Sequence, residues 1–100
     1  MLLFLLLSEE IKSKSIKRDN IIYLFMELLR NIFASSCVEA AARKVGCSTG
    51  EMYRRMKRVG LISGFIMPGY EGLHTQSREY VTDITLQALD IWENKQGIAL

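Results

Sequence analysis

Residues 40–62 of this 100-residue chain, which decide its fold, are AAARKVGCSTGEMYRRMKRVGLI. Gly46 separates an alanine-rich segment from a segment that combines basic side chains with methionines. Glycine ends a helix at no steric cost because it takes the left-handed conformation easily. The stretch therefore predicts one short helix over 36–45, capped by Ser35 or Ser36, and a second helix that follows the glycine.

The second of these helices carries its own start and stop signals. Ser48 is followed three residues later by Glu51, a capping box in which each side chain satisfies an unpaired backbone N–H. Met52, Met56 and Val59 recur at i, i+4 and i+7 and predict its buried side. Gly60 is expected to end it.

Charge is distributed unevenly along the chain. The formal net charge is only +2. Residues 35–62, however, carry six basic and two acidic side chains, whereas residues 63–100 carry two basic and five acidic ones. A concentrated basic segment is what a polyanionic partner requires.

Two short helices joined by a tight glycine turn, the second of them basic, describe a helix-turn-helix. Such a motif needs a small residue near the helix crossing, where Ala42 stands, and an apolar residue facing the core, where Met52 stands. The N-terminal side chains of the second helix then face the DNA major groove.

Residues 40–62 resemble the Fis-type helix-turn-helix, found in the nucleoid protein Fis and at the C-terminus of NtrC-type activators. The resemblance extends over about residues 20–62 when the preceding apolar helix, the dimer core of that family, is included. It implies that Ser48 and Thr49 contact bases and phosphates, although that family often has arginine at the position of Thr49. The predicted DNA-binding residues are Ser48, Thr49, Gly50, Tyr53, Arg54, Arg55, Lys57 and Arg58. Packing at the domain surface is an alternative role for Tyr53.

The segment 20–34 is expected to form an almost entirely apolar helix. Its polar residues between Ile21 and Phe33 are Glu27, Arg30 and Asn31, which form one narrow stripe. A helix this apolar must be covered on nearly all sides, and a second subunit is the simplest source of cover. We therefore expect an intertwined homodimer whose interface contains Ile22, Phe25, Met26, Leu29 and Phe33.

The remaining segments complete an all-α, single-domain prediction for residues 1–100. A first helix is expected over 2–16, so that residues 1–34 serve dimerisation and 35–62 form the helix-turn-helix. Pro68 and Gly69 suit a type II turn, and the flanking residues favour a short hairpin at 64–73. A final helix with an acidic face is expected over 76–94.

Several functional classes lack support in the sequence. Cys37, Cys47 and His74 cannot supply four zinc ligands without carboxylates, and the two cysteines suit buried thiols in a reducing cytoplasm. No catalytic pairing or phosphate-binding loop is recognisable, so we expect neither an enzyme nor a cofactor. The apolar run Met1–Leu7 is too short to span a membrane.

The leading hypothesis is a cytoplasmic, nucleoid-associated homodimer that binds duplex DNA as a transcriptional regulator or nucleoid factor. An alternative is an adaptor that binds another protein, with the acidic C-terminal helix as its docking surface, and does not use DNA. A third, weaker hypothesis is a membrane-proximal module that uses Leu2–Leu7.

Overall fold

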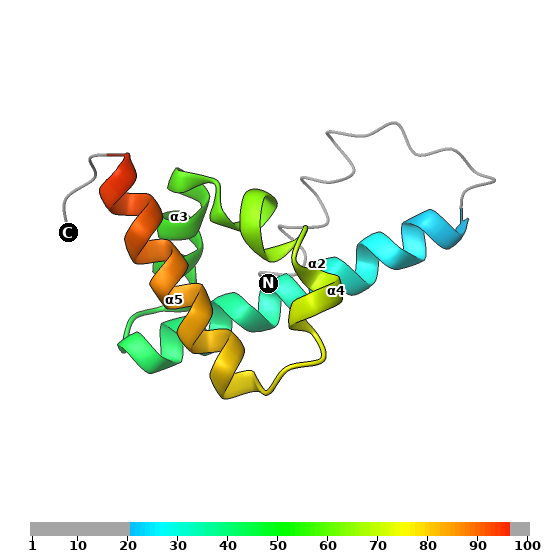
Figure 1. The fold of residues 1–100 in the computed structure, drawn as a ribbon, viewed down its shortest axis with the longest axis horizontal. Coiled ribbons are helices and arrows are strands. Elements are labelled where there is room, and N and C mark those ends of the chain that lie inside the picture. The colour runs from blue at the N-terminus through cyan, green and yellow to red at the C-terminus, as the bar shows by residue number, and fades with distance from the viewer. Residues whose placement is uncertain (1–20, 97–100) are drawn as a thin grey trace.

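The computed structural model describes residues 21–96, which form a compact helical body with one projecting helix (Figure 1). The element order is α2 (Ile21–Val45), α3 (Thr49–Val59), the π-helical turn η1 (Ile62–Ile66), α4 (Tyr70–Leu73) and α5 (Arg78–Lys95). This arrangement confirms the all-α prediction. The helix predicted over 2–16 and the apolar run Met1–Leu7 lie outside the described residues.

Helix α2 is one continuous helix of 25 residues, so the predicted division near Ser35 is wrong. The two serine side chains bond within the helix and do not cap a new one. Ser35 Oγ donates to Glu39 Oε2 at 3.2 Å, and Ser36 Oγ donates to the Phe33 carbonyl at 2.9 Å. Ala34 and Val38 on either side are fully buried, so packing keeps the backbone helical through the serines.

The turn after α2 and both ends of α3 agree with the sequence prediction. Gly46 has a φ of 88°, and its N–H donates to the Ala42 carbonyl at 2.8 Å. Gly60 ends α3 with a φ of 73°. Both positions need the left-handed conformation that glycine adopts without strain.

The hairpin predicted at 64–73 is wrong, because residues 62–66 and 70–73 are helical, a turn joins them, and no strand occurs within residues 21–96. Gly69 has a φ of −83°, so Pro68 and Gly69 do not form a type II turn, which needs a positive φ at the glycine. Ile62 and Ile66 are both buried, at helical spacing. A Cβ on Gly64 would lie 2.9 Å from Trp92 Cη2, so the π turn packs closely against α5.

The core is formed where the C-terminal half of α2, α3, η1 and α5 meet. Helices α2, α3 and α5 contact one another in all three pairings. The fully buried side chains include those of Val38, Met52, Met56, Leu61, Ile66 and Leu89. The predicted buried side of α3 is thereby confirmed, and α5 packs against both α2 and α3.

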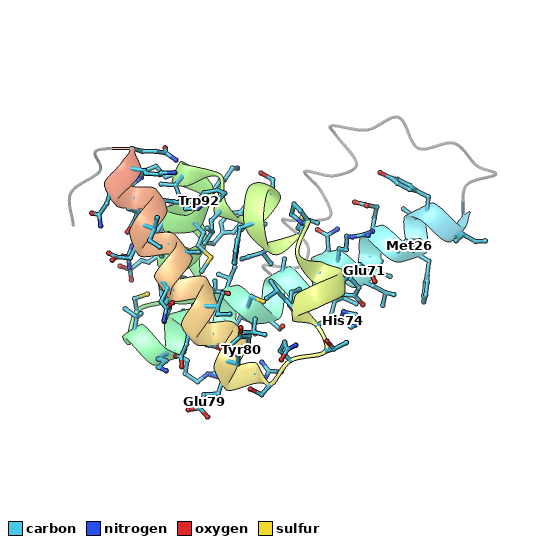
Figure 2. All side chains as sticks on the ribbon, viewed as in Figure 1. Met26, Glu71, His74, Glu79, Tyr80 and Trp92 are labelled. Carbon is cyan, nitrogen blue, oxygen red and sulfur yellow. The ribbon has the colours of Figure 1, made fainter. Side chains whose placement is uncertain are left out.

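The N-terminal half of α2 extends beyond this body, and Met26 lies on the projecting part (Figure 2). The apolar side chains here are exposed, with Ile22 at 77%, Phe25 at 58% and Met26 at 41% of their full surface. We call this surface, made by Ile22, Phe25, Met26, Leu29 and Ile32, the apolar face of α2. Phe33, also expected at the dimer interface, is partly buried and instead packs edge-on against Tyr70, with ring centroids 5.4 Å apart.

The polar stripe of α2 faces the protein's own chain. Asn31 is fully buried, and its Nδ2 donates to the Glu27 carbonyl at 2.7 Å. The Arg30 guanidinium lies 5.7 Å from the centroid of the Tyr70 ring in α4. The projecting half of α2 therefore turns polar groups inward and apolar groups outward, the reverse of an ordinary surface helix.

Candidate nucleic-acid interface

The start of α3 is fixed by the capping box predicted from the sequence. Ser48 Oγ accepts a hydrogen bond from the Glu51 backbone N–H at 3.1 Å, and Glu51 Oε1 accepts one from the Ser48 backbone N–H at 3.4 Å. Ser48 Oγ also lies 3.0 Å from Glu51 Oε1. The Glu51 carboxylate is therefore held at the helix end, where it compensates the positive end of the helix dipole.

The exposed side of α3 is basic. Arg54, Lys57 and Arg58 lie at i, i+3 and i+4, and all three side chains are exposed. Ser48 and Gly50 are exposed at the N-terminal end of the same helix, and Thr49 is partly exposed. We call the surface made by Thr49, Gly50, Arg54, Lys57 and Arg58 the basic face of α3.

Tyr53 lies on the buried side of α3, and only 8% of its surface is exposed. The Lys57 ammonium lies 5.7 Å from the centroid of its ring. Of the two roles considered for Tyr53, this burial agrees with packing. The ring then supports a basic side chain of the neighbouring surface through a cation–π contact.

Arg55 is paired within the chain. Its Nε donates to Glu93 Oε2 at 2.7 Å and its Nη2 donates to Glu93 Oε1 at 2.8 Å, a bidentate pair between α3 and α5. Only 1% of the Glu93 side chain is exposed. These hydrogen bonds raise the pKa of the Arg55 guanidinium. Its pairing with Glu93 gives this arginine a structural role.

A second basic side chain is neutralised in the same way. Lys44, near the end of α2, forms an ion pair with Asp83 of α5, and this contact raises the pKa of the lysine. Two of the six basic residues of the segment 35–62 therefore pair with the acidic helix α5. The sequence showed the acidic composition of α5, but it did not show that Asp83 and Glu93 are the residues that meet these bases.

The described residues hold no cluster of three or more potential metal ligands. Cys37 and Cys47 are both free thiols. No helix within residues 21–96 is long and apolar enough to cross a membrane.

A family model described as a protein of unknown function, DUF3791, matches residues 32–87. The match covers more than half of the chain, which therefore belongs to this family. It includes the whole of α3 and the turn before it, but ends before Glu93 and excludes most of the apolar face of α2. No curated protein and no solved structure matches the chain.

The Arg55–Glu93 pair generates a stability prediction. Glu93→Gln removes the buried negative charge and leaves the guanidinium without its ionic partner, so we expect a loss of about 1–3 kcal/mol in the free energy of unfolding. Asp90→Asn, an exposed position one turn earlier, should change it by less than about 0.5 kcal/mol. Urea unfolding of both variants measures the difference. If the Glu93→Gln variant were as stable as the Asp90→Asn variant, the ion pair would contribute nothing to the free energy of unfolding.

Proposed function

We propose that this member of the DUF3791 family binds duplex DNA as a homodimer, with α3 as the recognition helix, and acts as a transcriptional regulator or nucleoid-associated factor. The observation that carries the proposal is the basic face of α3. Arg54, Lys57 and Arg58 are exposed together on the side opposite the buried Met52 and Met56. A helix that is anchored on one side and cationic on the other meets the requirements for lying in a major groove.

The N-terminal end of α3 is suited to approach the bases. Thr49 and Gly50 are small, and Ser48 and Glu51 satisfy each other in the capping box. Glu51 is thereby kept from presenting an unpaired carboxylate to the DNA backbone. The arginine often found at the position of Thr49 in Fis-type motifs is absent, so this chain would read its target with different base contacts.

The apolar face of α2 supports the homodimer. The five large apolar side chains of this face are exposed, and pairing with a second copy would remove them from water. Two recognition helices related by a dyad would then enter successive major grooves, which lie roughly 34 Å apart on straight DNA.

A second candidate function is protein binding through α5. Tyr80 and Ile91 are 51% and 56% exposed, and their spacing of eleven residues puts them on one side of the helix. Glu79 and Asp90 beside them are exposed as well. This surface would fit a basic partner, and it supports the adaptor alternative in which DNA is not bound.

Removing charge from the basic face of α3 tests the DNA proposal. Arg54→Gln and Arg58→Gln should each weaken binding to a duplex about tenfold at low salt, because each removes a charge-assisted contact to phosphate. Each should also lower the slope of log K against log salt by about one. Fluorescence anisotropy at several salt concentrations measures both quantities.

Arg30→Gln is the matched control, because it removes the same charge from a residue outside α3. Arg30 lies in the projecting half of α2 and contacts Glu27 at 3.7 Å. It should leave duplex affinity within about twofold of the wild type. The DNA proposal fails if the wild-type protein shows no salt-sensitive binding, or if the control weakens binding as much as the α3 variants do.

The dimer is tested by placing a charge on the apolar face of α2. Phe25→Asp should raise the dimer dissociation constant at least about tenfold, because a carboxylate would have to be buried at the interface. Ile91→Asp alters a side chain of nearly equal exposure on α5 and should leave the dimer intact. Light scattering over a range of concentrations measures the mass. A wild-type protein that stays monomeric throughout contradicts the dimer.

A further inference from the structure

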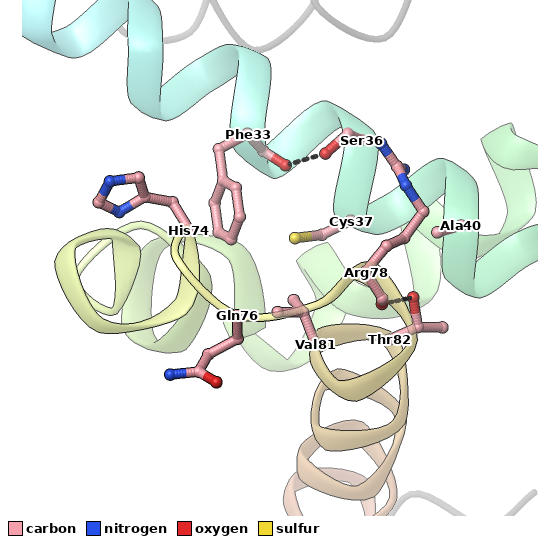
Figure 3. Close-up of a pocket in the computed structure, with 9 residues that line it drawn as sticks. All are labelled: Phe33, Ser36, Cys37, Ala40, His74, Gln76, Arg78, Val81 and Thr82. Atoms are coloured by element: carbon pink, nitrogen blue, oxygen red, sulfur yellow. Dashed lines mark hydrogen bonds between the residues drawn. The ribbon is translucent and has the colours of Figure 1, made fainter.

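A cavity of about 290 Å³ lies between α2, the loop that follows α4 and the first turns of α5 (Figure 3). Its volume is at the lower end of the range for small-molecule sites. Residues from three separate segments meet here. They are Phe33, Ser36, Cys37, Ala40, His74, Gln76, Arg78, Val81 and Thr82.

One part of the wall is apolar and fixed. The Phe33 ring is held edge-on by Tyr70, and Val81 is 5% exposed. Ala40 adds a small surface from α2. These side chains would contact the apolar body of a ligand without having to move.

Three polar groups of the wall are already engaged by the scaffold. Ser36 Oγ donates to the Phe33 carbonyl, and Thr82 Oγ1 donates to the Arg78 carbonyl at 2.8 Å (Figure 3). His74 Nδ1 lies 2.6 Å from the Tyr70 carbonyl, and its ring stacks on Tyr70 with centroids 4.3 Å apart. These contacts fix the orientation of the three side chains, and the two hydroxyl groups have already donated their hydrogens.

Arg78, Cys37 and Gln76 remain, and each of them can donate a hydrogen bond to a ligand, although the Gln76 amide can also accept one. The Arg78 side chain is exposed and has no acidic partner within residues 21–96. Cys37 is 4% exposed, and its thiol points into the cavity without a hydrogen-bond partner in the described part of the chain (Figure 3). Burial raises the pKa of this thiol to about 12, so the S–H is retained at neutral pH. The lining contains neither Asp nor Glu.

The surroundings of Arg78 contain charges of both signs. A second hollow of about 270 Å³ shares Ala40, Arg78 and Thr82 with the cavity and is also lined by Arg43 and Lys44. Glu79 is the single acidic residue of that lining. Lys44 is paired with Asp83, and Glu79 offsets Arg43, so Arg78 itself is the group between the two hollows that favours an anion.

We propose that this cavity binds a small organic monocarboxylate, whose carboxylate pairs with the Arg78 guanidinium while its apolar body packs against Phe33 and Val81. An arginine fork matches a carboxylate in bidentate geometry, and the apolar wall selects organic acids over inorganic anions. The inference goes beyond DNA binding and does not depend on it, because neither Phe33 nor Arg78 belongs to the basic face of α3.

Benzoate and its neutral analogue benzamide are the probes for this site. Titration of the full-length, isotopically labelled protein by NMR should give saturable benzoate binding, with amide shifts at Cys37 and at residues 76–82. Benzamide should bind at least about tenfold more weakly, because it cannot form the ion pair. Inorganic phosphate should not compete with benzoate at equal concentration.

Arg78→Gln should weaken benzoate binding about tenfold or more while leaving the fold unchanged, since this side chain has no partner to lose. Arg43→Gln is the matched control, because Arg43 lines only the second hollow. This variant should bind benzoate with the affinity of the wild type. Three results would each overturn the proposal. They are equal affinities of the wild type for benzoate and benzamide, a wild-type benzoate affinity in Arg78→Gln, and a loss of benzoate affinity in Arg43→Gln as large as in Arg78→Gln.

Discussion

The bidentate ion pair between Arg55 and Glu93 is the contact on which the rest of the structure depends. It joins α3 to α5 across 38 positions of sequence, with one carboxylate almost fully removed from water. A second link lies one turn further along both helices, where Gln96 Nε2 donates to the Val59 carbonyl at 3.1 Å. Without α5, α3 would be held mainly by its buried side chains Met52, Tyr53, Met56 and Val59. With α5 in place, the C-terminal half of α3 is tied down by polar contacts as well, and its basic face is presented in one fixed orientation.

Features that depend on a few consecutive residues could be predicted from the sequence. The turn at Gly46, the capping box of Ser48 and Glu51, and the end of α3 at Gly60 are all set by local backbone chemistry. Features that depend on distant partners could not. Arg55 resembles any other basic residue of the segment until Glu93 is known to face it. The π turn is likewise shaped by Trp92, which lies 28 positions after Gly64, and α2 stays continuous because distant packing outweighs two serines.

Apolar residues make up 49% of this 100-residue chain, and many of those that stay exposed lie in one place. That place is the projecting half of α2, where Asn31 is buried and Ile22 and Phe25 face outward. Exposing these apolar side chains to water is unfavourable. The orientation is explained if one side of α2 packs on the protein's own core and the opposite side packs on another surface. The same helix thus contributes to the core at one end and offers an apolar surface at the other. Dimerisation would use that surface, and the charge of α3 would then be presented twice.

The central claim is that α3 carries the DNA-binding surface, and an NMR titration of the labelled protein with a short duplex tests it most directly. The account predicts amide shift changes concentrated between residues 49 and 58, which fade as the salt concentration rises because the contacts are largely to phosphate. Changes confined to the Tyr80–Ile91 side of α5, or no salt-sensitive changes at all, would contradict it.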